Sequence, residues 1–284
     1  MKCLILAAGY ATRLYPLTEN FPKPLLKVGD RTILDWLIDD IHSSGLVDEF
    51  VVISNHKFAA IFEKWAQGRQ PQPTKTSASL HPSQPDGWAP PVHSATGGQG
   101  FLRAEAALPW PVIKVVDDGT STNETRLGAV CDIKFAIDKL GLDDDMLVIA
   151  GDNVLDFSLV KFVEYATRKG TSCIMRYFEA DEKRLHKSGI VEVDDNDLIL
   201  SMEEKPSQPK SNWCCPPFYY YTKEDARLVG EGIASGCGTD APGSYIAWLA
   251  TRVPVHAMEM PGKRYDIGNL ESYHQVCQEY SGII

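Results

Sequence analysis

The N-terminal segment combines small residues and cations in an order suited to phosphate binding. A short apolar run ends in Ala8 and Gly9, and Thr12, Arg13 and Lys23 follow. Small residues let backbone N–H groups approach anionic oxygens, and concave sets of such groups bind anions. A guanidinium offers phosphate a planar fork, and an ammonium offers a point charge. The segment therefore predicts a phosphate cradle.

Two common phosphate-binding motifs do not occur in the chain. Both the dinucleotide fingerprint G-x-G-x-x-G and the P-loop pattern G-x-x-x-x-G-K-[ST] are absent. The run Gly97-Gly98-Gln99-Gly100 lacks a preceding strand, and residues 68–110 around it are rich in proline and glycine. We therefore interpret 68–110 as a long loop and not as a phosphate site.

Three later segments place charged residues at the ends of predicted strands. Asp152 follows a strand-like run, and open α/β sheets bind ligands at the carboxyl ends of strands. Glu204 and Lys205 follow another such run, and Asp266 begins the sequence Asp-Ile-Gly. Each also has an ordinary structural interpretation, as a turn acid, a helix cap or an exposed ion pair.

Taken in order, these segments resemble the signature of the sugar-1-phosphate nucleotidyltransferases, which make nucleotide sugars. The family pattern is close to L-x-x-G-x-G-T-R-L-x-P-L-T and then P-K-P, Gly-Asp, Glu-Lys-Pro and Asp-Ile/Val-Gly. Residues 6–18, 22–24, 151–152, 204–206 and 266–268 match these motifs. The resemblance extends over nearly the whole chain outside 68–110 and is to glucose-1-phosphate thymidylyl- and uridylyltransferases.

The resemblance implies a Mg²⁺-dependent reaction between a nucleoside triphosphate and a sugar-1-phosphate, giving an NDP-sugar and pyrophosphate. Positioning and electrostatic stabilisation can supply most of the catalysis, and no protein nucleophile is needed. Asp152 and Asp266 are implied to hold Mg²⁺, which takes oxygen ligands. Arg13 and Lys23 are implied to bind the triphosphate and stabilise the departing pyrophosphate.

The resemblance also implies where the two substrates bind. Lys205 matches the lysine that contacts the sugar phosphate and joins Arg13, Lys23 and Asp152 as an expected catalytic residue. Glu204 matches the acid that hydrogen-bonds sugar hydroxyls, and Gly189 lies at the expected sugar-side glycine turn. The expected nucleotide-binding residues are Ala8, Gly9, Thr12, Arg13, Lys23, Asn123 and Gly128.

The segment that reads the base allows two interpretations. Gly128 lies at a small-residue helix start, where backbone can approach the ring, and Asn123 and Asp118 can hydrogen-bond a base edge. Asn123 and Asp118 are equally suited to be turn and cap residues.

Two stretches depart from the family pattern. Ala11 replaces the second signature glycine, which costs on the order of 1 kcal/mol if the position needs a positive φ. The stretch 213–218, Trp-Cys-Cys-Pro-Pro-Phe, replaces a small-residue strand, so the identity of the sugar is left open.

Alternating apolar segments predict the fold that must position these residues. Strands are expected at 4–7, 50–53, 112–116 and 146–150, with helices at 32–41, 58–65, 126–140 and 159–166. This rhythm predicts an α/β, Rossmann-like three-layer sandwich with a mixed, mostly parallel central sheet. Strands at 172–177, 190–193, 198–202 and 218–221, with helices at 241–251 and 270–280, indicate an α+β second half.

We therefore predict one nucleotidyltransferase domain over 1–284. Residues 1–170 form its nucleotide-binding half, with the loop at 68–110, and residues 171–284 form its sugar-phosphate-binding half. The chain ends soon after the last predicted helix, so we expect no added C-terminal repeat domain. Family enzymes often assemble, so a homo-oligomer is one option.

Composition excludes several other classes of protein. The net charge is −10, from 28 Lys+Arg and 38 Asp+Glu, which argues against a nucleic-acid partner. No apolar run reaches the roughly 18 residues of a membrane span, and the short apolar start is unlike a signal peptide. The seven cysteines have no C-x-x-C spacing, so free thiols and a cytoplasmic location are expected.

Two rival functions remain open at this point. Related enzymes transfer a cytidylyl group to phosphocholine or a similar phosphate. A non-catalytic nucleotide-sugar sensor would bind nucleotide without releasing pyrophosphate, and its only support is Ala11 and the altered stretch 213–218.

Overall fold

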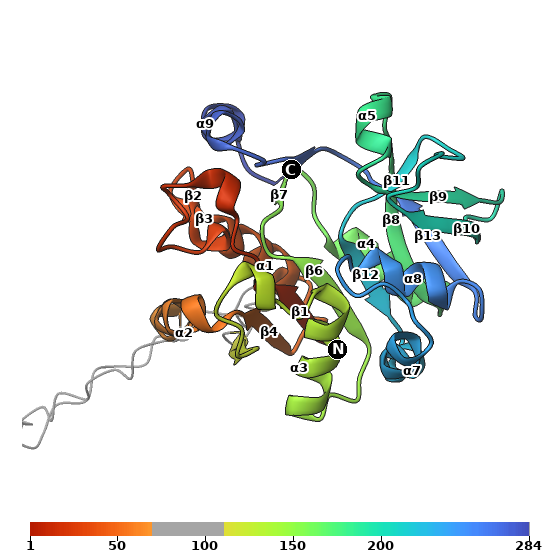
Figure 1. Ribbon diagram of the computed structural model, residues 1–284, viewed down its shortest axis with the longest axis horizontal. Coiled ribbons are helices and arrows are strands. Elements are labelled where there is room, and N and C mark those ends of the chain that lie inside the picture. The colour runs from red at the N-terminus through yellow and green to blue at the C-terminus, as the bar shows by residue number, and fades with distance from the viewer. Residues whose placement is uncertain (70–110, 284) are drawn as a thin grey trace, which may run out of the picture.

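A mixed sheet forms the centre of the protein (Figure 1). The computed structural model describes residues 1–69 and 111–283. The strands lie in the order β10-β9-β11-β8-β12-β6-β1-β4-β5, and β13 pairs with β8. Helices cover both faces of this sheet, so the expected α/β three-layer architecture is confirmed.

The first half of the chain contributes the parallel strands. They are β1 (Lys2–Leu6), β4 (Glu49–Ser54), β5 (Val112–Asp117) and β6 (Met146–Ala150). β1 lies between β4 and β6, and its residues from Cys3 to Ile5 are fully buried, as is typical of a parallel strand covered on both faces. All four strands end at the same edge of the sheet, which therefore gathers the loops that follow them.

The second half extends the sheet mainly by antiparallel pairing. Its strands are β8 (Ser172–Phe178), β9 (Gly189–Val193), β10 (Ile199–Glu204), β11 (Trp213–Cys215), β12 (Phe218–Tyr221) and β13 (Val255–Glu259). β9 and β10 form the hairpin expected around the acidic turn at 194–197. β12 joins this half to β6, so the two halves share one sheet.

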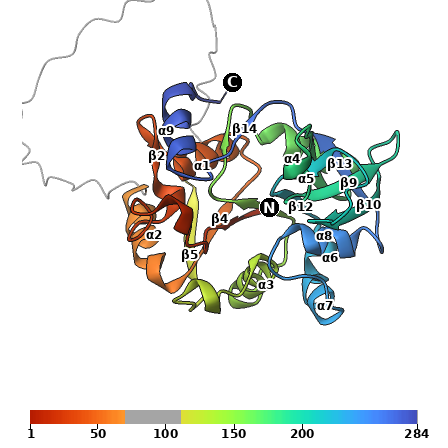
Figure 2. The same ribbon diagram turned by 45° about the horizontal axis from the view of Figure 1, so that its top comes forward.

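Helices pack on the two faces according to the alternation of apolar residues in the strands. Cys3 and Ile5 of β1 belong to one core cluster, and Leu4 belongs to the other. The first cluster includes apolar residues of α1 (Ile33–Ser43), α2 (His56–Arg69), α4 (Val160–Lys169) and α9 (Leu270–Glu279). The second includes residues of α3 (Ala129–Leu140), α6 (Lys223–Arg227), α7 (Val229–Ala234) and α8 (Gly243–Leu249). Figure 2 shows α1 and α3 on different sides of the parallel strands.

Several expected boundaries were wrong. The helix expected at 126–140 begins only at Ala129, because Gly128 has φ 89°, and residues Asn123–Thr125 form a short 3-10 turn instead. The helix expected at 241–251 is shorter, and strands β11 and β13 were not predicted. Residues 68 and 69 of the expected long loop belong to α2, and its remainder at 70–110 lies outside the described residues.

Two small ribbons hold loops at the carboxyl edge of the parallel strands. β2 (Lys27–Val28) pairs with β3 (Arg31–Thr32). β7 (Val154–Leu155) pairs antiparallel with β14 (Arg264–Tyr265), with Tyr265 opposite Val154. This register brings the residues just before β7 and just after β14 to the same end of the ribbon.

Two further expectations concern the chain as a whole. All seven cysteines lie within the described residues and are free, as expected. Of the helices in 1–69 and 111–283, none has the length and apolar character needed to cross a membrane.

Candidate active site

The loop that leaves β1 is tied to the end of the neighbouring strand. Ala7 donates its backbone N–H to Ile53 O at 2.9 Å, and buried Asn55 donates its side-chain amide to Ala8 O, also at 2.9 Å. Asn55 Oδ1 in turn accepts from Phe58 N at 3.1 Å, at the start of α2. The expected phosphate loop therefore has a fixed conformation at the carboxyl edge of the sheet.

Ala11 occupies the left-handed region, with φ 47° and ψ 42°. An L-residue there costs about 1–2 kcal/mol, because its Cβ crowds the following carbonyl. The fully buried Thr18 donates its hydroxyl to Ala11 O at 2.8 Å and holds this turn. The expectation that alanine is strained at this signature position is confirmed.

The strained turn leads into a short 3-10 helix, Thr12–Leu14. This helix carries Arg13, which lines the cavity described below, whereas Thr12 is exposed and does not line that cavity. The nucleotide contact expected of Thr12 stays a prediction.

An ion pair joins the second cation of the signature to the first expected metal ligand. Lys23 Nζ lies 2.6 Å from Asp152 Oδ2, and the lysine side chain is 10% exposed while the aspartate is 44% exposed. Gly151 makes this approach possible. A Cβ at position 151 would lie 2.8 Å from the Ile5 side chain and 3.5 Å from Pro24. The Gly-Asp and Pro-Lys-Pro motifs therefore fit together as two packed segments.

The charge of Asp152 is set by its neighbours. Burial by itself would raise the pKa of this carboxyl, but the ammonium of Lys23 and the guanidinium of Arg264 lower it below the ordinary value. Arg264 is held in place because its Nη1 donates to Asn153 Oδ1 at 3.2 Å. Asp152 is thus an ionised carboxylate at neutral pH, next to two cations.

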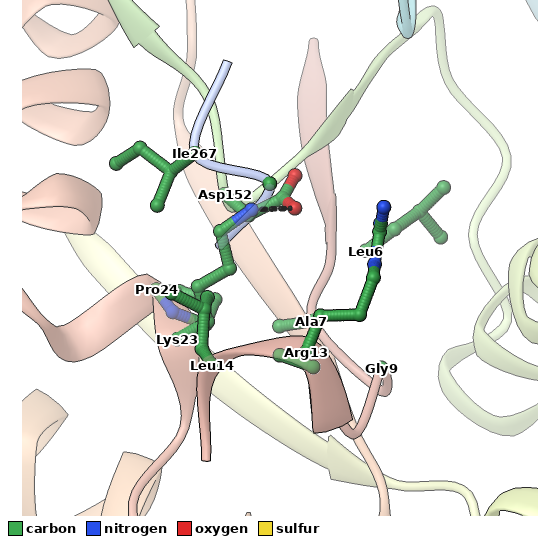
Figure 3. A pocket seen from close by; sticks show the side chains of 11 residues that line it. Leu6, Ala7, Gly9, Arg13, Leu14, Lys23, Pro24, Asp152 and Ile267 are labelled. Carbon is green, nitrogen blue, oxygen red and sulfur yellow. Dashed lines mark hydrogen bonds and ion pairs between the residues drawn. The ribbon is translucent and has the colours of Figure 1, made fainter. Parts of the chain in front are cut away.

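Arg13, Lys23 and Asp152 meet in one cavity of about 270 Å³. Figure 3 shows Lys23 extending to Asp152, with the Arg13 side chain beside them. The remaining lining residues are Leu6, Ala7, Gly9, Ala11, Leu14, Pro24, Ile267 and Gly268. Three of the four expected catalytic residues are therefore brought together from three separate segments.

Asp266 lies next to this cavity and not in it. The exposed Asp266 lines a neighbouring, larger cavity together with Arg13, while Ile267 and Gly268 reach the cavity of Asp152. The β7–β14 ribbon explains the proximity, since Tyr265 pairs with Val154. Within 1–69 and 111–283, no group of three or more His, Cys, Asp or Glu side chains is arranged to hold a metal. The donor set is therefore two carboxylates at most.

A second cavity, of about 230 Å³, lies on the other side of the loop after β1. It shares Leu6 and Gly9 with the first cavity. Its wall includes four of the expected nucleotide-binding residues, Ala8, Gly9, Asn123 and Gly128, together with Leu6, Arg126, Ala129, Asp132 and Asp240. The structure thus brings Asn123 and Gly128 to the signature loop.

Gly128 is required by a close contact with another loop. Its φ of 89° is rare for a residue with a side chain, and a Cβ there would lie 2.6 Å from Thr239 O. Thr239 O accepts from Val130 N at 3.0 Å, and Asp240 O accepts from Ala129 N at 3.3 Å. The first N–H groups of α3 are therefore satisfied by the chain itself.

Two buried carboxyl groups face each other beside this second cavity, which Asp132 lines and Asp118 does not. Asp118 and Asp132 are 7% and 6% exposed. Asp118 Oδ2 and Asp132 Oδ1 have no hydrogen-bond partner among the described residues. Burial and the charge of Asp118 raise the pKa of Asp132 to about 7, and burial raises the pKa of Asp118 as well. The pair therefore holds a proton up to near-neutral pH.

The expected sugar-side residues form a separate group. Gly189 and Glu204 lie opposite each other in β9–β10, and a Cβ at Gly189 would lie 2.8 Å from Glu204 Oε2. Glu204 also contacts Gly243 of α8, and burial raises the pKa of this carboxyl. Lys205 has φ 51°, and its Nζ lies 3.6 Å from Asp240 Oδ2. Lys205 thus reaches the edge of the second cavity and does not line the cavity of Asp152.

Sequence reasoning missed several residues at these cavities. Asp240 pairs with Arg126 at 2.6 Å as well as with Lys205, and Arg264 acts on Asp152. Arg264 lies only two residues before Asp266 of the Asp-Ile-Gly motif, so this proximity could have identified it as a site residue. Asp240 lies far from every recognised motif, so no local pattern indicated it.

Comparison with known proteins identifies a matching family and several relatives. A family model described as nucleotidyl transferase matches residues 2–282. The chain is 25% identical over 281 residues to a UTP–glucose-1-phosphate uridylyltransferase of Synechocystis sp., covering 98% of this chain and 63% of that protein. It is 25% identical to a glucose-1-phosphate thymidylyltransferase of Neisseria gonorrhoeae, covering 98% of this chain and 88% of that protein. It is also 25% identical to the bifunctional protein GlmU of Methanocaldococcus jannaschii, covering 94% of this chain and 51% of that protein. The chain therefore spans only part of the length of two of these relatives.

Solved structures share the fold. A UDP-glucose pyrophosphorylase complexed with UDP-glucose superimposes with a TM-score of 0.73 at 18% identity, covering 98% of this chain and 97% of that one. The apo form of a UDP-glucose pyrophosphorylase also gives 0.73, at 19% identity. At this level of identity the likeness concerns the fold alone.

Proposed function

The chain belongs to the nucleotidyl transferase family, and from this premise we propose that it transfers a nucleotidyl group from a nucleoside triphosphate to a sugar-1-phosphate. The observation that carries the proposal is the convergence of Arg13, Lys23 and Asp152 in one cavity at the carboxyl ends of β1 and β6. A guanidinium, an ammonium and an ionised carboxylate at this position suit a reaction between two anionic phosphates.

The proposed reaction exchanges one P–O bond for another. A phosphate oxygen of the acceptor attacks the α-phosphorus, and the bond from that phosphorus to the bridging α–β oxygen breaks. Pyrophosphate leaves with that electron pair. Arg13 and Lys23 are suited to bind the β- and γ-phosphates, because their positive charges stabilise the negative charge that grows on the leaving group.

Mg²⁺ fits the carboxylates available here. Asp152 is ionised and 44% exposed on its side chain, and Asp266 is exposed nearby, so two hard oxygen donors face the phosphate cavities. Mg²⁺ commonly uses one or two carboxylates plus substrate phosphates. Asp152 and Asp266 would hold the ion, which when bound supplies positive charge to the phosphate oxygens.

The nucleotide and the acceptor would occupy different sides of the signature loop. The cavity that contains Asn123 and Gly128 suits the base and ribose, since it shares the lining residues Leu6 and Gly9 with the phosphate cavity. The acceptor's hydroxyls would meet Glu204 opposite Gly189. Lys205 is half exposed, and its ion pair with Asp240 at 3.6 Å is weak, so a substrate phosphate could replace Asp240 at little cost in free energy.

The direct test is pyrophosphate release with Mg²⁺ from individual nucleoside triphosphates, each offered a panel of sugar-1-phosphates. Release that requires one triphosphate and one sugar-1-phosphate is the expected result. Release with phosphocholine but with no sugar would support the cytidylyltransferase alternative. Nucleotide binding without release from any acceptor would support the sensor alternative and contradict the proposal.

A pair of variants tests the role of the carboxylate. Asp152→Asn should reduce kcat by at least about 100-fold, because the cavity loses its negative charge and a metal ligand. Asp143→Asn is the matched control, since Asp143 precedes the same strand β6 at its opposite end and pairs with Lys223 at 2.8 Å. Equal rates for the two variants would remove Asp152 from the mechanism.

A further inference from the structure

A cationic groove opens from the phosphate cavity toward the second half of the chain. It has a volume of about 760 Å³, nearly three times that of the cavity around Asp152. Its cations are Arg13, Arg184, Lys187, Lys263 and Arg264. We call this the cationic groove. Arg13 lines both spaces, so the cationic groove and the phosphate cavity are neighbours.

The positive charge of the cationic groove is only partly compensated. Its wall contains three carboxylates against five cations, in a protein of net charge −10. Of these cations, Arg184 lies 3.6 Å from Glu179 and 3.8 Å from Asp181, which is outside the wall. In the described parts of the chain, no carboxylate oxygen lies within 4.0 Å of the charged nitrogens of Arg13, Lys187 or Lys263. Clustered cations without counter-charges attract an anionic ligand.

The cationic groove lies on the side expected for the acceptor. Tyr177 and Ser188 line it, and Ser188 directly precedes Gly189, the expected sugar-side glycine. Arg184 belongs to the short helix α5 (Glu182–Leu185), and Lys187 follows it, with its backbone N–H bonded to Arg184 O at 3.0 Å. Arg13 lies where the cationic groove meets the phosphate cavity, so an acceptor whose reacting phosphate faces the α-phosphorus from this side would extend its far end toward these two cations.

We propose that the acceptor carries a second anionic group, a phosphate or a carboxylate, which Arg184, Lys187 and Lys263 bind at the far end of the cationic groove. The inference rests on the proposed transferase function and narrows its acceptor class. A guanidinium and two ammonium groups suit such a group, because charge-assisted hydrogen bonds to phosphate and carboxylate are the strong ones. The same cations would repel the quaternary ammonium of phosphocholine.

The test compares acceptors that differ only at the end remote from the reacting phosphate. Glucose 1-phosphate, glucose 1,6-bisphosphate and glucuronic acid 1-phosphate are offered to the wild-type protein with the same triphosphate. We expect kcat/KM to be about 10- to 100-fold higher for one or both of the doubly anionic acceptors, as one or two charge-assisted contacts would give. The bisphosphate and the uronic acid distinguish phosphate from carboxylate.

Variants locate the effect in the cationic groove. The double substitution Arg184→Ala with Lys187→Ala should bring the doubly anionic acceptors to within about threefold of glucose 1-phosphate, while turnover of glucose 1-phosphate stays unchanged. Lys183→Ala is the control, because Lys183 lies in α5 but does not line the cationic groove. The preference should survive in the control.

Three outcomes would overturn the proposal. Equal kcat/KM for all three acceptors would show that no second anion is recognised. A raised KM for the triphosphate in the double variant, with unchanged acceptor preference, would assign these cations to the triphosphate tail. If the protein turns over none of the three acceptors, their affinities for the wild-type protein are measured by calorimetry instead. Equal affinities for the three acceptors would refute the proposed role of the cationic groove. If the protein binds the bisphosphate preferentially but releases no pyrophosphate, only the proposed transferase function is refuted.

Discussion

Replacing Asp132 by asparagine should change how the stability of the protein depends on pH. Asp132 is 6% exposed, faces Asp118 and has a pKa of about 7 instead of its ordinary 3.8. The folded state therefore binds this proton more tightly than the unfolded state. The stability that results is present in full below the ordinary pKa and is lost as the pH rises toward 7.

The size of the effect follows from the difference between the two pKa values. Each pH unit between them is worth about 1.4 kcal/mol, so the free energy of unfolding should fall by about 3 kcal/mol between pH 5 and pH 8 because of Asp132. The asparagine in the variant has no proton to lose, and its amide can donate to the unpartnered Asp118 Oδ2 at every pH. The free energy of unfolding of the Asp132→Asn variant, relative to that of the wild-type protein, should therefore increase by about 3 kcal/mol from pH 5 to pH 8.

Urea unfolding of both proteins at half-unit steps from pH 5 to pH 8 measures this difference. Asp138→Asn is the control, since Asp138 lies in the same helix but is exposed and pairs with Lys134 four residues earlier. Its curve should run parallel to that of the wild-type protein. If the Asp132→Asn curve also runs parallel, within about 0.5 kcal/mol, the shared proton does not exist and our interpretation of this pair is wrong.

Three further substitutions test the loops that build the site. Ala11→Gly should raise the free energy of unfolding by up to about 1 kcal/mol. Glycine adopts φ 47° without strain, although the greater entropy of unfolded glycine offsets part of this gain. A lower free energy of unfolding in urea titrations would show that Ala11 is not strained. Gly128→Ala should cost about 2–3 kcal/mol in the same assay, since its Cβ would lie 2.6 Å from Thr239 O at a positive φ; a neutral result would mean that this loop can move. Lys23→Met should raise the pKa of Asp152, measured by NMR titration of its carboxyl carbon, because the ammonium at 2.6 Å is removed; an unchanged value would make Arg264 the controlling charge.

Local patterns predicted the secondary structure where one face or both faces of an element are apolar throughout. The strands β1, β4 and β6 are runs of mostly buried apolar residues, and α1 has a capping box between Thr32 and Asp35, so each was recognisable from its own residues. The strands β11 and β13 were not predicted because they are formed by pairing with β8, which is distant in sequence. The start of α3 was wrong because a contact with Thr239 fixes Gly128 in a non-helical conformation.

The sequence determined the chemistry that the site can offer. The order of Gly9, Arg13 and Lys23 indicated an anion-binding loop, and the departure at Ala11 predicted a strained backbone that the structure contains. The backbone strain could be predicted because the loop is contiguous, so that its residue types and spacing alone restrict its conformation, whereas anion binding by the loop stays a prediction.

Tertiary structure alone decided which charges meet. The 2.6 Å contact between Lys23 and Asp152 joins residues 129 positions apart, and the cationic groove gathers Arg13, Arg184 and Lys263 from three regions of the chain. The pairing of Asp118 with Asp132 likewise depends on the folded chain, because Asp118 follows β5 and Asp132 lies in α3, which packs on β1 and β4. Electrostatic effects fall off within several ångströms in solution, so pKa values and ligand preferences follow from distances that only the folded chain sets.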